Sequence, residues 1–315
     1  MREAVRYAAE KQLKLFVLGG GSNLVVADSG WPGLVLKIAV NGIEERRAGD
    51  RVEFTAGAGE DWDGFVAQTV ARDCAGIECL SGIPGTVGGT PVQNVGAYGQ
   101  EVSDVIRSVR VLDLASGDAR ELDAAAAGFA YRTSVFNTNA RGRYIVLQVT
   151  FALTPGGEPH IEYADLKRFF ATRTSRPTLA ETREAVRDIR LSKAMLIVPG
   201  DDDCRSAGSF FKNPIVSCEE YEQLSSRTGA RVPSFPAQDG KRKLAAAWLV
   251  ENSGFHKGLT RGAVGISRKH ALAIVNRGGA RAADIIALKD DIQDTVEQRF
   301  RIRLQPEPVF VGFDE

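Results

Sequence analysis

Glycine and proline are concentrated in residues 82–91, which read Gly82-Ile-Pro-Gly-Thr-Val-Gly-Gly-Thr-Pro91. Four glycines and two prolines in ten residues fix an irregular backbone and leave its N–H groups unshielded by side chains. Gln93 and Asn94 follow and add amide donors and acceptors. We favour a loop that binds a ligand through its backbone, and a buried structural loop is the alternative.

A second glycine cluster, Gly19-Gly-Gly-Ser-Asn23, follows a predicted strand. Consecutive backbone N–H groups can surround anionic oxygens. The dinucleotide-binding spacing G-x-G-x-x-G is not met, because Leu24 occupies the position of the last glycine, and no Walker A lysine is present. On these local grounds a tight structural turn is favoured, and a phosphate site is the alternative.

Three single polar residues have neighbours that suggest chemistry. Arg132 lies between a tyrosine and two hydroxyl residues, and a guanidinium binds carboxylate or phosphate through two parallel hydrogen bonds. Ser209 lies between a glycine and two phenylalanines, which would desolvate a proton-donating hydroxyl. No G-x-S-x-G motif and no histidine lie near it in the sequence, which argues against a nucleophilic serine. Glu307 is held between two prolines. Taken alone, Arg132 and Glu307 are more simply explained as surface side chains.

The sequence predicts both helices and strands around these residues. Apolar periodicity predicts helices near 3–11, 61–75, 163–171, 178–191, 217 onward, 244–252 and 282–300. Short apolar runs predict strands near 15–18, 24–27, 34–38, 43–47, 51–56, 105–114, 144–153, 271–275 and 309–312. Ser217-Cys-Glu-Glu220 is a capping-box pattern, and residues 76–104 are predicted to form one long ordered loop. Because strands and helices do not alternate strictly, the pattern favours an α+β fold.

The composition limits the possible functions. The chain has 315 residues, enough for two or three domains. Forty basic residues balance forty acidic ones, which argues against a nucleic-acid-binding protein. No apolar stretch approaches the ~20 residues that span a bilayer, and no cleavable leader pattern follows Met1. We therefore expect a soluble cytoplasmic protein without membrane insertion, acting as a monomer.

Cysteine and histidine are scarce. The four cysteines include no C-x-x-C pair, and the chain has three histidines. A structural zinc site needs four clustered ligands, so we predict no metal site and no disulfide framework. With so few of these residues, difficult chemistry is expected to come from an organic cofactor.

Taken together and in this order, the motifs resemble those of the MurB family of flavoenzymes, the UDP-N-acetylenolpyruvoylglucosamine reductases of peptidoglycan precursor synthesis. The matching stretches extend over nearly the whole chain and are residues 18–24, 83–99, 131–136, 208–214, 236–240, 243–249 and 306–307. The resemblance implies an α+β fold with three domains, of the vanillyl-alcohol-oxidase-like type. Residues 1–40, completed by 308–315, would form one FAD-binding lobe, 41–189 the second lobe, and 190–307 a C-terminal substrate-binding domain.

The same resemblance implies the reaction and its cofactors. NADPH would reduce FAD, and a hydride would then pass to C3 of the enolpyruvyl group of UDP-N-acetylglucosamine enolpyruvate, giving UDP-N-acetylmuramate. Ser209 would protonate C2, while Arg132 and Glu307 would stabilise the enolate-like intermediate. The implied FAD-binding residues are Gly19, Gly20, Gly21, Ser22, Asn23, Ile83, Pro84, Gly85, Thr86, Gly88, Gly89, Thr90, Gln93, Asn94, Gly96 and Ala97. The implied substrate-binding residues are Tyr163, of a mobile segment typical of the type I subgroup, with Arg190, Lys193, Lys212 and Asn213.

These roles are physically consistent. Hydride addition at C3 builds negative charge at C2 and its carboxylate, where a guanidinium is stabilising. A serine hydroxyl is a weak acid that suits a strongly basic intermediate and needs a donor network. An ionised Glu307 would repel the developing anion, so we expect it to act protonated, or to orient Arg132 and a water.

Two features depart from the family pattern. Members usually begin earlier, with a strand bearing an Asn-Thr pair, so the first lobe is expected to be shortened at its N-terminus or the start to be misassigned. Residues 195–205 form a longer and more acidic connection than usual, with Asp201, Asp202 and Asp203. The alternatives are a related FAD oxidoreductase for another substrate, which the joint presence of Ser209, Arg132 and Glu307 opposes, and an inactive or truncated homologue that binds a UDP-sugar without turnover.

Overall fold

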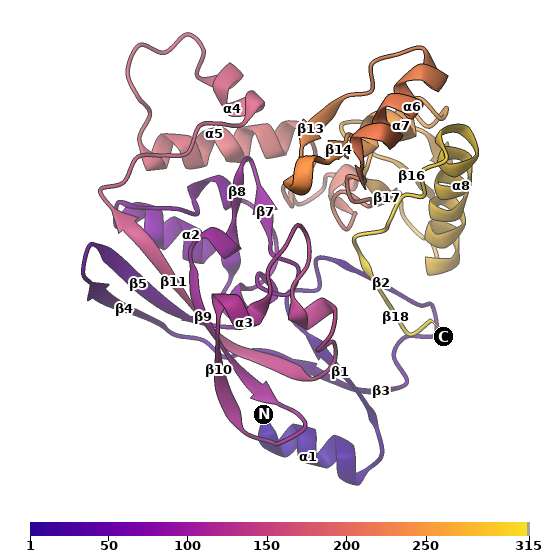
Figure 1. Ribbon diagram of the computed structural model, residues 1–315. Helices are drawn as coiled ribbons and strands as arrows, with labels where there is room; N and C mark the ends of the chain where they lie inside the picture. The colour runs from indigo at the N-terminus through magenta and orange to yellow at the C-terminus, as the bar shows by residue number, and fades with distance from the viewer. Residues whose placement is uncertain (314–315) are drawn as a thin grey trace. The chain divides into compact units, whose positions relative to one another are not determined.

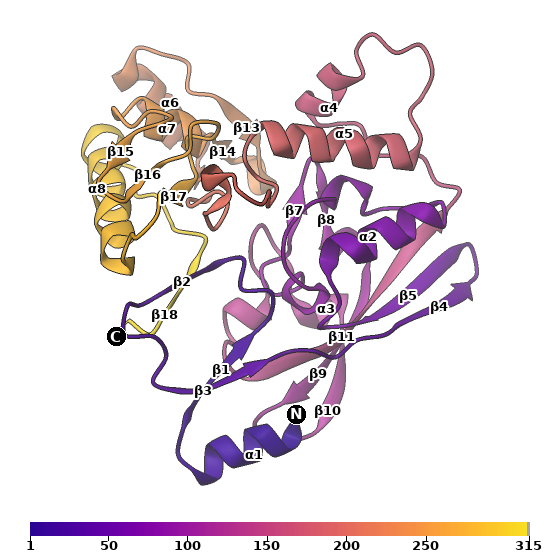
Figure 2. The same cartoon turned by 180° about the vertical axis from the view of Figure 1, so that it is seen from behind.

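The computed structural model describes residues 1–313, which divide into two compact units (Figures 1 and 2). Unit 1 consists of Met1–Gly21 and Pro32–Ser192. Unit 2 consists of Ser22–Trp31 and the chain from Lys193 onward. The predicted division into three lobes stays a prediction, and residues 314–315 of the predicted closing segment lie outside the described residues.

Unit 1 is built on a mixed set of helices and strands. Its helices are α1 (Arg2–Glu10), α2 (Trp62–Ala71), α3 (Ala124–Ala127), α4 (Ala164–Phe169) and α5 (Leu179–Ser192). Its strands are β1 (Lys14–Leu18), β3 (Gly33–Lys37), β4 (Ile43–Ala48), β5 (Arg51–Gly57), β6 (Cys74–Ala75), β7 (Gly96–Ala97), β8 (Gln100–Glu101), β9 (Ile106–Asp113), β10 (Ala119–Asp123) and β11 (Tyr144–Pro155). The main sheet has the order β10-β9-β11-β5-β4 and is antiparallel, and β1 pairs in parallel with β3.

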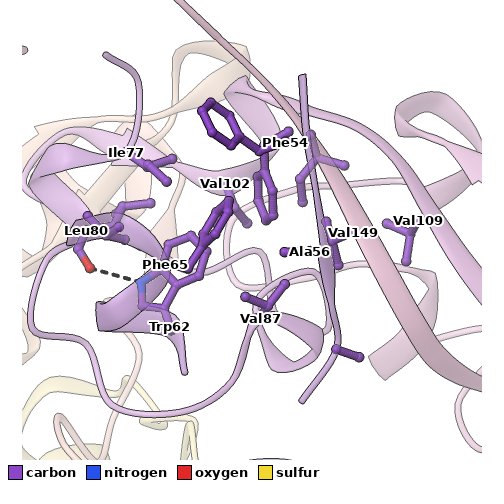
Figure 3. Close-up of a cluster of buried hydrophobic side chains, with 14 of the residues drawn as sticks. Phe54, Ala56, Trp62, Phe65, Ile77, Leu80, Val87, Val102, Val109 and Val149 are labelled. Carbon is purple, nitrogen blue, oxygen red and sulfur yellow. Dashed lines mark hydrogen bonds between the residues drawn. The ribbon is translucent and has the colours of Figure 1, made fainter. Parts of the chain in front are cut away.

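One face of the main sheet forms the core of unit 1 with α2. Alternate residues of β5 are buried, as the two-residue side-chain period of a strand requires. Phe54 of β5 pairs with Phe151 of β11, and both rings pack with Phe65 of α2. Trp62 adds its ring and donates its indole N–H to the carbonyl of Leu80 at 3.0 Å (Figure 3). This bond ties the glycine- and proline-rich loop to the hydrophobic core.

The helix predicted over 61–75 is shorter than expected. It begins where predicted, because the Asp61 carboxylate accepts the N–H of Gly64 at 2.8 Å. It ends at Ala71, since Asp73 adopts a left-handed conformation with φ 54°. Cys74 and Ala75 then pair with the end of β11. The prediction was wrong there because a long-range strand pairing overrides local helical propensity.

The predicted loop over 76–104 is ordered and contains only short elements. These are the 3-10 turns η1 (Glu78–Leu80), η2 (Val87–Gly89) and η3 (Val102–Asp104), with the hairpin β7-β8. Glu78 is fully buried at its start. Its carboxylate accepts N–H groups of Gly76 at 2.8 Å, of the Gln100 side chain at 2.9 Å and of His160 at 2.8 Å. A buried, satisfied carboxylate therefore ties its own turn to β8 and to His160.

The described residues of unit 2 form three small sheets and three α-helices. Its helices are α6 (Cys218–Thr228), α7 (Ala246–Glu251) and α8 (Ala282–Phe300). Its strands are β2 (Leu24–Val26), β12 (Ile215–Val216), β13 (Ser234–Pro236), β14 (Arg242–Leu244), β15 (Thr260–Arg261), β16 (Val264–Ile266), β17 (Ile274–Asn276) and β18 (Val309–Val311). The sheets have the orders β12-β14-β13, β15-β16-β17 and β18-β2, the last being parallel. The core gathers the buried stripe of α8, namely Leu288, Ile292, Val296 and Phe300, with α7 and β16.

Some boundaries in unit 2 differ from the prediction. The capping box is confirmed, because Ser217 and Glu220 exchange backbone-to-side-chain bonds of 2.7 and 3.1 Å. The helix predicted over 244–252 begins at Ala246, since Leu244 pairs with Ser234 in a sheet. The strand predicted over 271–275 lies at 274–276. In residues 1–313 no helix is long and apolar enough to cross a membrane.

Asp28 caps α8 from a segment far away in the sequence, and we expect its loss to destabilise unit 2. Its carboxylate accepts the N–H groups of Ala282 at 2.7 Å and of Ala283 at 3.4 Å. Asp28→Ala should lower the free energy of unfolding by about 0.5–2 kcal/mol, while Asp28→Asn, which keeps an acceptor, should lose much less. Urea unfolding measures both changes. Equal stability of the alanine variant and the wild type would contradict a capping role.

Candidate active site

The two glycine segments of unit 1 lie against each other. A β-carbon added to Gly20 would lie 2.5 Å from the Cα of Gly85 and 3.2 Å from the backbone N of Thr86. A β-carbon on Gly19 would lie 3.2 Å from the Thr86 hydroxyl oxygen. Any side chain at Gly20 would therefore force the segments apart. The structure brings together two motifs that lie more than sixty residues apart in the sequence.

Beside this contact the loop offers an unsatisfied hydroxyl and open space. The Thr86 hydroxyl oxygen is buried and has no hydrogen-bond partner among residues 1–313. A β-carbon on Gly89 would meet nothing within 4 Å. Buried polar atoms in folded proteins are nearly always hydrogen-bonded, so an orphan atom calls for a partner that the chain does not supply. These two features fit a polar ligand held against residues 85–89.

Other members of the predicted cofactor set are used by the protein itself. Gly88 packs on Ala58, where a β-carbon would come within 2.5 Å of the alanine methyl. The Thr90 hydroxyl donates to the Val87 carbonyl at 2.7 Å. The buried Asn94 amide donates to Glu101 at 2.7 Å and to the Ala130 carbonyl at 3.1 Å. These side chains shape the loop.

The remaining predicted cofactor residues are distributed as follows. Ile83 and Ala97 pack against the core of unit 1, and Pro84, Gln93 and Gly96 lie in the same loop and its hairpin. Gly21 has φ 75°. Ser22 and Asn23 belong to unit 2, so the predicted turn over 19–23 extends across the boundary between units.

Arg132 is held in a strained turn beside β7. Ala130 and Thr133 bond to each other's backbone at 2.9 and 3.0 Å, and Arg132 between them has φ 54°. Its guanidinium donates to the Gly96 carbonyl at 2.7 Å and lies 5.3 Å from the centre of the Tyr131 ring. Left-handed conformations of non-glycine residues cost roughly 1 kcal/mol or more and are concentrated at functional sites. The turn sets the backbone position of Arg132, and the bond to the Gly96 carbonyl holds its guanidinium.

Arg190 secures the other end of the glycine-rich loop. Its side chain is only 6% exposed, and its Nε donates to the Gly82 carbonyl at 3.1 Å. It also bonds to Tyr98, whose pKa burial raises to about 12. The Tyr98 ring meets the partly exposed ring of Tyr163 edge-on, with centroids 5.3 Å apart. Arg190 and Lys193, predicted as a basic pair, fall in different units.

Asp63 also holds Gly82, and the sequence analysis did not identify this acid. Asp63 accepts the N–H of Gly82 at 2.6 Å and binds the guanidinium of Arg183 through both oxygens at 2.6 and 2.9 Å. Arg187 donates to the same carboxylate at 2.6 Å. Gly82 is thus held through both its N–H and its carbonyl. The spacing of Arg183, Arg187 and Arg190 places them on one helical face, and this basic face could have predicted an acidic partner.

In unit 2 the backbone brings Ser209 next to Glu307. Gly208 has φ 76° and precedes the serine, and the two phenylalanines that follow are buried. The Glu307 N–H donates to the Phe210 carbonyl at 2.9 Å, and Phe211 pairs with Pro306. The Glu307 carbonyl accepts the side-chain N–H of Asn23 at 3.1 Å. Two of the three predicted catalytic residues therefore lie on neighbouring segments of the chain, which an isolated bridge and one backbone hydrogen bond join.

A histidine lies beside the serine, which the sequence did not suggest. The Ser209 hydroxyl oxygen lies 2.9 Å from Nε2 of His270, sixty-one residues away. Burial, together with the charges of Lys193 and Lys257, lowers the pKa of His270 to about 4. The imidazole is neutral at pH 7. A separation of this length carries no sequence motif, although only three histidines had to be considered.

Lys212 and Asn213, which are also predicted to bind the substrate, follow Ser209 closely in the sequence. Lys212 donates its backbone N–H to Gln305 at 2.9 Å. The Asn213 side-chain oxygen accepts the first N–H of α7, from Ala246, at 2.9 Å. Asn213 is thus a helix cap whatever else it contacts.

Two family sequence models match the chain. Residues 1–123 match the sequence model of an FAD binding domain, and residues 199–311 match the model of the UDP-N-acetylenolpyruvoylglucosamine reductase C-terminal domain. The first segment contains both glycine motifs, and the second contains Ser209, His270 and Glu307.

Full-length relatives extend the match. The chain is 48% identical to the UDP-N-acetylenolpyruvoylglucosamine reductase of Saccharopolyspora erythraea, over 99% of this chain and 87% of the relative. It is 47% identical to that of Thermobifida fusca, over 95% and 86%. The crystal structure of UDP-N-acetylenolpyruvylglucosamine reductase (MurB) from Thermus caldophilus matches with a TM-score of 0.65 and 25% identity, over 99% of this chain and 90% of that one. The predicted α+β, FAD-binding fold and the predicted family are confirmed, and the chain belongs to the UDP-N-acetylenolpyruvoylglucosamine reductase (MurB) family.

Proposed function

We propose that this protein reduces UDP-N-acetylglucosamine enolpyruvate to UDP-N-acetylmuramate with NADPH, as a monomer in the cytoplasm. It is an FAD-dependent oxidoreductase of peptidoglycan precursor synthesis. The observation that best supports the specific reaction is the backbone bond from Glu307 to Phe210, which brings Glu307 beside the segment that carries Ser209 in unit 2. Both residues lie inside the segment that matches the family's C-terminal domain.

The chain's residues fit the cofactor. FAD, when bound, supplies the chemistry of accepting a hydride from NADPH and delivering it to the substrate's vinyl carbon. Gly89, which faces open space, would allow its pyrophosphate to approach the backbone, while Gly19, Gly20 and Gly85 hold the two segments together. The orphan hydroxyl of Thr86 would gain a partner. Ser22 and Asn23 complete the proposed cofactor set.

The substrate side follows from charge and proton requirements. Arg132 would bind the enolpyruvyl carboxylate and stabilise the charge that builds on it. Ser209 would release its hydroxyl proton to C2. Glu307 would act as a hydrogen-bonding carboxyl beside the serine. Tyr163, Lys193 and Lys212 would contact the nucleotide part of the substrate, and Arg190 and Asn213 would hold the surrounding backbone.

The purified protein tests the proposal. Its visible spectrum should be that of a flavoprotein, and denaturation should release the yellow chromophore, because neither glycine segment contains a histidine or cysteine that could link it. NADPH oxidation should depend on UDP-N-acetylglucosamine enolpyruvate. A colourless protein that binds the UDP-sugar without turnover would support the inactive-homologue alternative instead.

Thr86→Val should change the affinity for FAD without lowering the stability of the FAD-free protein. Removing an unpartnered buried hydroxyl should leave the stability of the FAD-free protein unchanged or slightly raised. Losing a hydrogen bond to FAD should raise its dissociation constant by about 3–10-fold. Calorimetric titration of the FAD-free protein measures this change.

Thr90→Val is the matched control. Its hydroxyl bonds within the protein, so this variant should lose roughly 1 kcal/mol of stability and bind FAD nearly as the wild type does. If the two variants had the same effect on FAD affinity, Thr86 would not be a cofactor contact.

A further inference from the structure

The contact between Ser209 and His270 is not used by the function proposed above. We propose that His270 is a positioning residue that donates its Nε2–H to the Ser209 hydroxyl oxygen, so that the serine hydrogen is directed away from the imidazole and toward the substrate carbon. The inference rests on the proposed function in one respect, namely that Ser209 is the proton donor.

The histidine is held by a tight turn. The hydroxyl of Ser267, which is fully buried, accepts the N–H groups of Lys269 at 3.0 Å and of His270 at 3.3 Å. The His270 carbonyl accepts the N–H of Ala273 at 3.2 Å. Hydrogen bonds to both the N–H and the carbonyl of His270 therefore fix the backbone position from which the imidazole extends.

The acidic segment that departs from the family pattern anchors the same turn. Asp203 is fully buried and accepts the backbone N–H of Arg268 at 3.2 Å and its Nε at 3.3 Å. Arg277 donates to the other oxygen of Asp203. Asp201 pairs with Lys269 at 2.9 Å. Two consecutive residues before His270 are thus tied to residues 201–203.

The serine is tied to the histidine's segment as well. The N–H of Phe210, directly after Ser209, donates to the carbonyl of Leu272, two residues after His270, at 2.8 Å. This backbone bond and the side-chain contact of 2.9 Å join the same two segments. The hydroxyl and the imidazole are held together by main chain, which is what a positioning pair requires.

Electrostatics favour donation by the histidine. In a Ser-His-Asp triad a carboxylate at Nδ1 leaves Nε2 as an acceptor and stabilises the imidazolium. Among residues 1–313, no carboxylate bonds to Nδ1 of His270. Burial and the positive charges of Lys193 and Lys257 oppose protonation of the ring and lower its pKa to about 4. A neutral imidazole can give the serine an N–H without withdrawing its proton.

The proton balance is simple. The O–H bond of Ser209 breaks and a C–H bond forms at C2 of the enolate-like substrate, which supplies the electron pair. Negative charge appears on the serine oxygen, where the Nε2–H of His270 stabilises it. A water molecule then returns a proton to the serine oxygen and leaves hydroxide, so that His270 begins and ends neutral.

Two substitutions test the hydrogen bond in rapid-mixing experiments on the FAD-loaded protein. His270→Phe should slow the substrate-dependent half-reaction by about 10–100-fold and enlarge its solvent deuterium isotope effect, because proton transfer becomes the slowest step. The NADPH-dependent half-reaction should change by less than about 2-fold, since no proton passes through Ser209 in it. His270→Gln keeps an N–H donor and should recover most of the rate.

His256→Phe is the control, since His256 is exposed and, among the described residues, its ring bonds to the neighbouring carbonyl of Lys257. Equal loss in both half-reactions of His270→Phe, or no rescue by glutamine, would overturn the positioning role. The visible flavin spectrum and thermal unfolding of each variant show whether it has folded.

A second measurement does not depend on turnover. In ¹⁵N-labelled protein, NMR of His270 should show a neutral ring protonated at Nε2, with a pKa of about 4, and Ser209→Ala should perturb that nitrogen. A ring protonated at Nδ1 would overturn the inference whatever the activity. If the wild type bound FAD but failed to turn over the enolpyruvyl substrate, the proposed function would fail, and the tautomer would still decide whether His270 donates to Ser209.

Discussion

Ser209→Ala is expected to slow the substrate-dependent half-reaction by about 10²–10⁴-fold and to leave the NADPH-dependent half-reaction nearly unchanged. The serine's proposed task is to deliver a proton to C2, which is needed only after NADPH has been consumed. The structure gives the hydroxyl one identified side-chain neighbour, His270, and bonds the Glu307 backbone to Phe210, the residue after the serine. Stopped-flow absorbance measures each half-reaction separately.

Ser226→Ala is a suitable control for this variant, because Ser226 is exposed on α6. It should behave as the wild type in both half-reactions. A loss of equal size in the two half-reactions of Ser209→Ala would remove the proton-donor role and point to a general defect in folding or cofactor binding.

Arg132→Lys is expected to lower kcat by about 10²–10³-fold with a smaller change in KM. Lysine keeps the charge but loses the planar pair of donors that matches a carboxylate. Because charge on the substrate carboxylate is greatest in the enolate-like intermediate, the loss falls on the chemical step. The Gly96 carbonyl holds one arm of the guanidinium, and an ammonium would not fill both places.

Arg141→Lys provides the comparison, since Arg141 is exposed close to Arg132 in the sequence. In steady-state kinetics Arg141→Lys should keep the kcat of the wild type, while Arg132→Lys should show the loss of about 10²–10³-fold. Wild-type turnover in Arg132→Lys would exclude a carboxylate clamp at this position.

Local patterns predicted most of the regular elements. The long amphipathic helix α8 and the apolar strand β11 were predicted within a few residues, because their periodicity extends over many positions. The edge strand β10 was missed, since its residues are mostly exposed and carry no apolar alternation. Strands of two or three residues, such as β12 and β15, are stabilised only by their partners and leave no local signal.

The site was predictable by residue type and only partly by contact. Glycine content identified residues 19–23 and 82–91, but the approach of Gly20 to Gly85 depends on the fold of unit 1. Predicted ligand contacts at Asn94 and Asn213 include side chains that hold the protein's own backbone. Both roles use the same amide group, so composition alone cannot separate them.

The contacts that complete the site come from distant parts of the chain. Asp63 meets Arg183 across 120 residues, and His270 meets Ser209 across 61. Ser22–Trp31 also belongs to unit 2 through a long-range contact, because β2 pairs with β18 near the other end of the chain. Such contacts follow from topology, which no local pattern encodes.

The most direct test of the proposed reaction is product analysis with the FAD-loaded protein in deuterated water. With NADPH and UDP-N-acetylglucosamine enolpyruvate, we expect UDP-N-acetylmuramate in an amount equal to the NADPH consumed, with one solvent-derived deuterium at C2. NADPH oxidation that does not depend on the enolpyruvyl substrate, or a product without deuterium at C2, would contradict the proposed reaction.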